Sequence, residues 1–331
     1  MSMRVSKAGL LTSIQDLGRR GFQQHGVIVS GAMDSYSLRI ANLLVGNDEN
    51  EAGLEVTLMG PTLEIESDCL VAITGGDLTP SVNGKPVPMW KPLFIPKGST
   101  LSFGPCKTGC RSYLSVAGGF AIDEVLNSKS TYLRGEIGGY KGRALQTDDV
   151  LPLSVPAASK PAFLSNELIN GVYTSSWSVN YKELVHFTKK PGVRVINGSQ
   201  YDLFTAESKS HFTKEPFKVS NQSDRMGYRM DGPSLQLQEK KELLSEAVSQ
   251  GSVQVPPDGN PIILLADRQT TGGYPKIAQV ITADLPLLAQ VKPGESIYFS
   301  HISLHEAEKI YLEKEQMLQE LKIAINLAST K

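Results

Sequence analysis

The chain has 331 residues, of which 40% are hydrophobic and 20% charged, and its formal net charge at pH 7 is −1. This composition is typical of a soluble globular protein that is long enough for two domains. A net charge near zero, without a basic stripe, argues against binding to nucleic acid or to an anionic membrane.

Strand patterns dominate the sequence. Short apolar or alternating runs are separated by turns, and the chain contains 30 glycines and 19 prolines. The predicted strands are, in chain order, 62–66, 69–74, 99–103, 113–116, 193–196, 262–266, 277–281 and 296–299. This spacing is typical of sandwiches and barrels rather than of βαβ repeats, so we predict a mainly β fold with a few helices.

An early helix is predicted at 34–45. It places Leu38, Ala41, Leu44 and Val45 on one side and ends at a Gly-Asn pair, which is a common helix C-terminus.

A C-terminal helix is predicted to begin at Ser303, where Glu306 completes a capping box. Its apolar stripe is formed by Leu304, Ala307, Tyr311, Leu318, Leu321, Ile325 and Ala328. We expect this helix to dock on a barrel, and the alternative is that it binds a partner.

The boundary between two domains is predicted at the proline-rich stretch 152–161, which has few large apolar residues. We predict an N-terminal β domain at 1–155, a connecting segment at 156–192 and a C-terminal β domain with the terminal helix at 193–331. The hexapeptide at 60–65 resembles the one at 232–237, which hints at duplication.

The sequence predicts neither a secreted protein nor a metal site. It has no apolar run of signal-peptide or membrane-spanning length. Cys69, Cys106 and Cys110 are too few for a disulfide framework, so we expect a reducing cytoplasm. His301 and His305 have the spacing of a metal pair, but the helix start lies between them, and we interpret them as a satisfied surface pair.

A polar loop at 267–276 follows a predicted buried strand and is longer than a hairpin turn needs. Gly272 and Gly273 would let backbone N–H groups approach a ligand oxygen. The alternative is that Asp267 pairs with Arg268 and that the glycines only turn the chain. We favour a site, whose candidate residues are Gln254, Asp267, Arg268, Gln269, Thr271, Gly272, Gly273, Tyr274 and Lys276.

Two further segments carry candidate residues. In the first, Gln15, Asp16 and Arg19 are followed by Ser30 and Asp34 at a helix N-terminus, which is a typical anion site. The alternative that Ser30 or Asp34 only caps the helix stays open. The second segment, 220–232, contains the candidates Asp224 and Arg225, although alternating charges usually mark a plain surface. The sequence contains no Gly-x-Ser-x-Gly elbow, so we expect proton transfer and charge positioning rather than a covalent acyl-enzyme.

These segments together resemble one known family, which is called allophanate hydrolase subunit 2, Kip A or the C subunit of 5-oxoprolinase. This family is similar to part of the carboxyltransferase domain of urea carboxylase. The resemblance extends from about residue 10 to residue 299, with Asn127 as a departure where glycine is expected. The matching segments lie at 15–19, 30–34, 51–55, 60–61, 223–229, 254–259 and 267–276.

The resemblance implies two cyclophilin-like β-barrel domains with a site in the groove between them. It also implies an ATP-dependent complex that opens 5-oxoproline to glutamate, in which this chain works with a B subunit (Kip I type) and an A subunit. The chain has no ATP-binding loop and no biotin-attachment motif, so we expect it to be inactive alone. The alternatives are a component of an allophanate hydrolase or urea amidolyase, and a regulator that sequesters a Kip I-type inhibitor of a sporulation histidine kinase.

The resemblance and the residue chemistry together suggest a role for each matched position. Arg268 and Arg19 would hold an anionic group, and Asp267 or Asp224 would orient or deprotonate the amide N–H. Gln254 and Gln269 would bond the carbonyl. The glycine pair would offer backbone donors, with Tyr274 as a wall.

Overall fold

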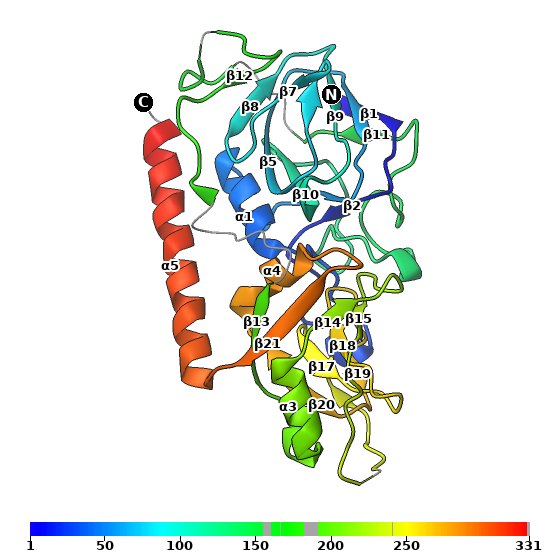
Figure 1. Ribbon diagram of the computed structural model, residues 1–331. Helices are drawn as coiled ribbons and strands as arrows, with labels where there is room; N and C mark the ends of the chain where they lie inside the picture. The colour runs from blue at the N-terminus through cyan, green and yellow to red at the C-terminus, as the bar shows by residue number, and fades with distance from the viewer. Residues whose placement is uncertain (155–159, 166, 182–190, 240, 330–331) are drawn as a thin grey trace. The chain divides into compact units, whose positions relative to one another are not determined.

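The computed structural model describes residues 1–154, 160–165, 167–181, 191–239 and 241–329. The chain divides into two compact units (Figure 1). The first unit comprises Met1–Arg19, Ser30–His186 and Met317–Lys331, and the second comprises Arg20–Val29 and Phe187–Gln316. Neither unit is therefore one continuous stretch of chain. The domain limits predicted from the sequence stay a prediction, because compactness alone does not show where an independently folding domain ends.

The first unit contains two antiparallel six-stranded sheets. One sheet has the strand order β11 (Val150–Pro152), β1 (Ser2–Lys7), β4 (Thr62–Ile65), β9 (Thr100–Ser102), β6 (Ser81–Val82) and β7 (Lys85–Pro86). The other has the order β12 (Tyr173–Thr174), β8 (Pro92–Ile95), β5 (Cys69–Asp77), β10 (Thr108–Val116), β3 (Gly53–Thr57) and β2 (Leu11–Gln15).

The two sheets share one hydrophobic core. Val5 and Leu63 from one sheet and Leu54, Ile73 and Leu114 from the other are fully buried in it. Alternation along β4 buries Leu63 and Ile65 and leaves Glu64 exposed, as expected for a sheet with one face toward the core. Burial of these side chains supplies the main driving force for folding of the unit.

Helix α1 (Ser35–Leu44) packs against β5 and β10 of the second sheet (Figure 1). Leu38, Ala41 and Leu44, which the sequence pattern places on one side, are all buried. The predicted limits were 34–45, and the structure makes Asp34 the N-cap and Val45 the C-cap, so this helix is confirmed.

The second unit is a closed barrel of seven strands. Their order is β13 (Gly192–Asn197), β20 (Lys276–Val280), β17 (Ser252–Gln254), β18 (Ile262–Leu264), β15 (Gly227–Asp231), β14 (Phe217–Val219) and β21 (Ser296–His301). The pair β13–β21 is parallel, and the other pairs are antiparallel. A separate two-stranded sheet joins β16 (Glu246–Ala247) to β19 (Thr271–Gly272).

Among the described residues, the remaining helices are short except for the last. They are α3 (Ala206–Lys214), α4 (Leu285–Ala289), α5 (Leu304–Ser329) and the 3-10 turns Gln23–His25, Leu133–Gly135, Tyr201–Leu203 and Thr282–Asp284. The capping box of α5 is present: the Ser303 N–H donates to Glu306 Oε2 at 2.8 Å, and the Glu306 N–H donates to Ser303 Oγ at 3.2 Å. Of the predicted stripe, Leu318 and Ile325 are buried, whereas Leu304 and Tyr311 are exposed. Only the C-terminal part of the stripe is therefore docked.

The mainly β fold with a barrel and a C-terminal helix is confirmed. All eight predicted strands are present, with ends shifted by at most three residues except that β10 begins five residues before the predicted strand. Two expectations change. Residues 60–65 contribute to β4, but 232–237 contain no strand, so the sequence echo has no structural counterpart. The polar loop at 267–276 is interrupted by β19. None of the helices described here is long and apolar enough to cross a membrane.

Candidate functional site

The predicted site residues fall into two clusters, one in each unit. The first unit holds Gln15, Asp16, Arg19, Ser30 and Asp34. The second holds Asp224, Arg225, Gln254, Asp267, Arg268, Gln269, Thr271, Gly272, Gly273, Tyr274 and Lys276. The expectation that the site lies in a groove between two barrels stays a prediction.

Asp16 directly follows strand β2 and is buried. Its Oδ1 accepts the Gly18 N–H at 2.7 Å and the Ser128 hydroxyl at 2.9 Å, and its Oδ2 accepts the Lys129 N–H at 2.7 Å. The Ser130 hydroxyl also donates to Oδ1. A carboxylate with this many donors holds its own loop, so Asp16 fixes the segment 128–130. Its predicted contact with a substrate stays a prediction.

Arg19 is fully buried and also hydrogen-bonds to the backbone between residues 125 and 130. Its Nε donates to the Val125 carbonyl and its Nη2 to the Ser130 carbonyl, both at 2.8 Å. A Cβ added to Gly138 would lie 2.5 Å from Nη2, so this close approach requires glycine. Arg19 thus has a structural role, and its expected anion-binding role stays a prediction.

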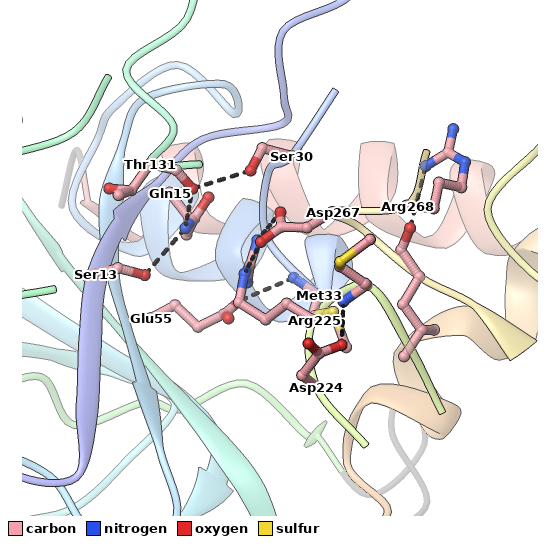
Figure 2. Close-up of polar contacts among 12 residues, drawn as sticks. Ser13, Gln15, Ser30, Met33, Glu55, Thr131, Asp224, Arg225, Asp267 and Arg268 are labelled. Atoms are coloured by element: carbon pink, nitrogen blue, oxygen red, sulfur yellow. Dashed lines mark hydrogen bonds and ion pairs between the residues drawn. The ribbon is translucent and has the colours of Figure 1, made fainter. Parts of the chain in front are cut away.

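Gln15 has an amide whose orientation is fixed by a carbonyl. Its Nε2 donates to Ser13 Oγ at 3.0 Å and to the Thr131 carbonyl at 3.1 Å, and that carbonyl also accepts the Ser30 hydroxyl at 2.9 Å (Figure 2). Because a carbonyl can only accept, the amide cannot be reversed. Gln15 Oε1 is buried and has no hydrogen-bond partner in the described part of the chain. A ligand N–H would complete it.

The segment 30–34 leads into helix α1 with unusual backbone angles. Ser30 has φ 59° and Gly31 has φ 90°, both in the left-handed region. Asp34 is fully buried; its Oδ1 accepts the Ser37 N–H at 2.9 Å, and its Oδ2 accepts the Ser37 hydroxyl at 2.7 Å. Its carboxylate thus occupies the helix N-terminus itself. For Asp34, the capping interpretation is the correct one.

Glu55 and Tyr113 form a buried pair beside this segment that the sequence patterns do not predict. A signal was available, because Glu55 ends one of the segments that carry the family resemblance. It also places a carboxylate in β3, a strand in which every residue is buried. A buried acid in such a strand requires partners, and it therefore marks a polar network.

Arg225 and Asp267 form a buried, bidentate ion pair in the second unit (Figure 2). Arg225 Nε lies 3.0 Å from Asp267 Oδ2, and Nη2 lies 3.1 Å from Oδ1. Both side chains are 5% exposed. The backbone repeats the link, since the Asp267 N–H donates to the Arg225 carbonyl at 2.9 Å. The alternative pairing of Asp267 with Arg268 is therefore wrong, and Asp267 connects the ends of β15 and β18.

Asp224 is exposed at the turn that precedes β15. Its Oδ1 accepts the Met226 N–H at 2.8 Å and the Gly227 N–H at 3.3 Å. This contact closes the turn and fixes the position of the carboxylate. Asp224 is thus a preorganised, solvent-accessible acid in this cluster.

Arg268 is half-buried and differs from Arg225 in its partners. Its Nη1 donates to the Leu265 carbonyl at 3.3 Å and its Nε to the Val248 carbonyl at 3.5 Å, which are long hydrogen bonds. No carboxylate within the described residues pairs with it. Burial, and to a smaller extent the like charge of Arg20, lowers the pKa of Arg268 to about 10. An anionic ligand would relieve both effects.

In the same cluster, Gln254 of the barrel strand β17 packs against Gly272 of β19. A Cβ on Gly272 would lie 2.5 Å from Gln254 Nε2, so the side-chain amide rests directly on the glycine backbone. Gln254 is buried and its Nε2 donates to the Tyr274 carbonyl at 3.5 Å. The glycine at 272 therefore allows this close packing of the Gln254 amide.

Lys276 already has an anionic partner inside the protein. Its ammonium pairs with Glu246 on β16, and Gln200 Nε2 donates to the same Glu246 oxygen at 3.0 Å. Gln200 also accepts the Lys276 N–H at 3.1 Å. These contacts hold the small β16–β19 sheet beside the loop. Lys276 can bind a substrate anion only by exchanging Glu246 for it.

The other loop residues differ in exposure. Gln269, Thr271 and Tyr274 are exposed, and Gly273 is half-buried. A Cβ on Gly273 would lie 3.3 Å from Ser245 Oγ, so space above it is limited by the segment before β16. The exposed residues are available to a ligand or to a partner protein.

The second cluster offers three kinds of group. They are the Arg268 guanidinium, which has no carboxylate partner among the described residues, the exposed Asp224 carboxylate, and donors from the Gln254 amide and the loop backbone. Such groups suit the binding of a small molecule that carries an anion and an amide. The part of the chain that the structure describes contains no group of His, Cys, Asp and Glu that could hold a metal ion. His301 is not a satisfied surface residue as predicted, because neither ring nitrogen has a hydrogen-bond partner among the described residues.

Residues 25–301 match the family model of the carboxyltransferase domain, subdomains A and B, and the chain belongs to this family. The resemblance seen in the sequence is thereby confirmed.

Individual proteins are also similar to this chain over most of its length. The chain is 39% identical to the C subunit of the 5-oxoprolinase of Haemophilus influenzae, over 94% of either chain. It is also 39% identical to the protein of that name in Escherichia coli, over 96% of this chain and 97% of that protein. The crystal structure of the K. lactis urea amidolyase matches with a TM-score of 0.87 and 31% identity, over 96% of this chain but only 20% of that one.

Proposed function

We propose that this chain is the C subunit of an ATP-dependent 5-oxoprolinase that opens 5-oxoproline to glutamate. The observation that carries this proposal is the 39% identity to two proteins that bear the name of the 5-oxoprolinase C subunit, over nearly the full length of both. The proposed partners are a Kip I-type B subunit and an A subunit. In this reaction the lactam C–N bond breaks and the elements of water are added.

The geometry supports a binding role for the second cluster. Arg268 would hold the carboxylate of 5-oxoproline, because its guanidinium is partly desolvated and has no acidic partner in the described chain. Asp224 would accept the lactam N–H, since its carboxylate is exposed and fixed by the turn. Gln254 and the backbone at Gly272 and Gly273 would donate to the lactam carbonyl.

Arg225, Asp267 and the first-unit residues have supporting roles in this proposal. The Arg225–Asp267 pair uses both carboxylate oxygens, so it positions the loop that carries Arg268. Gln15 offers Oε1 to a ligand N–H. Asp16, Arg19 and Asp34 hold the loops around Gln15 and Ser30.

We assign ATP to another part of the complex. The glycine-rich segment 135–143 has no P-loop spacing. Its glycines are used for packing, because a Cβ on Gly139 would lie 1.8 Å from Thr131 Oγ1. The segment is thus packed against its own unit, which supports this assignment.

The test is reconstitution of the complex from separately purified components. Glutamate release from 5-oxoproline and ATP should require this chain together with both proposed partners. Glutamate release at an undiminished rate when this chain is omitted would reject the proposal.

A urea amidolyase role is the second candidate, because the solved K. lactis urea amidolyase is similar over 96% of this chain. This chain mixed with a biotin carboxylase, a biotinylated carrier protein and an allophanate hydrolase, and supplied with urea, bicarbonate and ATP, distinguishes the two. Ammonia production from urea without glutamate production from 5-oxoproline would favour the second candidate.

A further inference from the structure

We propose that Glu55 and Tyr113 are positioning residues that hold the segment 30–34 in its binding conformation. This inference rests on the proposed function, because it assumes that Gln15 and Ser30 contribute to ligand binding. It adds two residues outside the predicted set and gives them a defined task.

The two side chains come from adjacent strands and act as one unit. Tyr113 on β10 lies opposite Glu55 on β3 in the strand register. The Tyr113 hydroxyl donates to Glu55 Oε2 at 2.8 Å and accepts the Asp34 N–H at 2.8 Å. The Met33 N–H donates to the same Glu55 oxygen at 2.8 Å (Figure 2). Two consecutive backbone N–H groups are therefore fixed by one Glu–Tyr pair.

The pair is more than a helix cap. Asp34 already caps α1 through Ser37, so the helix does not need a second acid for that purpose. Burying a carboxylate is unfavourable unless its hydrogen bonds and charge are compensated. Here Arg111 Nε lies 3.9 Å from Glu55 Oε1. An apolar pair would fill this space with less cost, so the acid points to a demand on the backbone of Met33 and Asp34.

Ser30 and Gly31, which precede Met33, have the backbone conformation that the Glu55–Tyr113 pair would hold. Ser30 and Gly31 have positive φ angles, and a Cβ on Gly31 would lie 2.9 Å from the Gly18 nitrogen. Such a backbone persists only where surrounding contacts fix it. The Ala32 N–H donates to the Asp16 carbonyl at 2.8 Å. A shift at residues 33 and 34 would thus move both Ser30 and the turn after β2.

The link to Gln15 is direct. Ser30 and Gln15 share the Thr131 carbonyl, which fixes the orientation of the Gln15 amide and thereby of its unpaired Oε1. Burial, followed by the nearby charge of Glu55, raises the pKa of Tyr113 well above its usual value. The hydroxyl therefore stays protonated and remains the donor to Glu55 at every working pH.

The test compares Tyr113→Phe with Tyr228→Phe in the full-length chain. Tyr228 is also buried and donates one hydrogen bond, to the Val291 carbonyl at 3.1 Å, so it is a matched control in the other unit. Hydrogen exchange of the peptide covering 30–37 should become at least about tenfold faster in Tyr113→Phe and stay unchanged in Tyr228→Phe. Unchanged exchange in Tyr113→Phe would overturn the proposal without any reference to activity.

Turnover of the reconstituted complex provides the second readout. We expect Tyr113→Phe to lower kcat/KM by about tenfold or more, with Glu55→Leu at least as impaired. Glu55→Gln should retain most of the wild-type kcat/KM, because one amide oxygen can still accept both hydrogen bonds. A purely structural role would make the loss follow thermal stability, and equal losses in Tyr113→Phe and an equally destabilised Tyr228→Phe would overturn the proposal.

These outcomes separate the two proposals. If wild-type turnover requires this chain but Tyr113→Phe is fully active, the positioning role fails and the proposed function stands. If the chain is dispensable for turnover, the proposed function fails, and the positioning role fails with it as a statement about catalysis. Faster exchange at 30–37 in Tyr113→Phe would then show only a structural anchor.

Discussion

Arg268 is the residue on which the proposed binding role depends most. We predict that Arg268→Lys lowers kcat/KM of the reconstituted complex about 10- to 100-fold, because lysine lacks the planar fork that binds a carboxylate. Steady-state rates with 5-oxoproline and ATP measure this. The exposed Arg229, changed to lysine, serves as the control and should differ less than about twofold. Full activity of the Arg268 variant would remove this residue from the site.

His301 should make the protein sensitive to acid. Its ring contacts Tyr201 and Phe212, and burial lowers the pKa of His301 below its ordinary value. The unfolded chain therefore takes up the proton first as pH falls, so this contribution to stability is complete above about pH 6.5 and is lost below it. We predict that His301→Phe loses less thermal stability between pH 7 and pH 5 than the wild type does.

Melting temperatures at the two pH values provide the measurement. The exposed His305, changed to glutamine, should leave the pH dependence as it is. An identical drop in melting temperature for His301→Phe and the wild type would show that another group is responsible.

At the scale of elements, the Arg225–Asp267 pair joins β15 to β18. We predict that Asp267→Asn lowers the free energy of unfolding by about 3–5 kcal/mol, because it leaves a buried guanidinium without its counter-charge. The double variant Arg225→Met/Asp267→Leu should be less destabilised than Asp267→Asn alone. Urea unfolding of the wild type and the two variants tests this, and a double variant at least as unstable as Asp267→Asn would contradict the argument.

The β16–β19 sheet is held by Glu246 against Lys276. The hydrogen bond from Lys276, followed by that from Gln200, keeps the pKa of Glu246 below its usual value, so Glu246 is charged at neutral pH. We predict that Glu246→Gln lowers the KM for 5-oxoproline severalfold, since the Lys276 ammonium no longer has a competing carboxylate. Exchange of the backbone amides at 246–247 and 271–272 should also become faster.

Glu242 in the same segment is exposed and provides the matched control. Changing it to glutamine keeps the overall charge difference but leaves the Lys276 contact intact. If both variants change KM equally, general electrostatics rather than release of Lys276 explains the effect.

At the scale of the whole molecule, helix α5 begins in the second unit and ends in the first. Leu318 is 0% exposed on this helix and Leu312 is 65% exposed. We predict that Leu318→Ala costs about 2–5 kcal/mol of stability, whereas Leu312→Ala changes it by about 0.5 kcal/mol or less. Thermal unfolding distinguishes them, and equal effects would show that the helix is not docked through this side.

Local patterns predict much of this fold. The alternation in 62–66 and the apolar run at 69–74 define strands without reference to distant residues, and both occur as β4 and β5. The helix α3 is not predicted, because Phe212 is its only large buried apolar side chain and its other residues are polar or small. Its position depends on packing beside β21. Because β21 is distant in the sequence, the residues around α3 do not reveal this contact.

The site is only partly predictable for the same reason. The sequence indicates the right loop at 267–276, yet Asp267 pairs with Arg225, 42 positions away, rather than with its neighbour Arg268. Likewise the partner of Lys276 is Glu246 on a strand that local patterns do not reveal. Charges identify which residues can act, whereas the fold decides which of them already have a partner.

The division of the chain has a consequence for how the protein is made. Leu318 and Ile325 are buried residues of the first unit, and they leave the ribosome after every residue of the second unit. We therefore expect the packing of the first unit to be incomplete while the barrel is already being synthesised. Chaperone binding during translation, and failure of gene fragments that stop before α5, are what this order of synthesis leads us to expect.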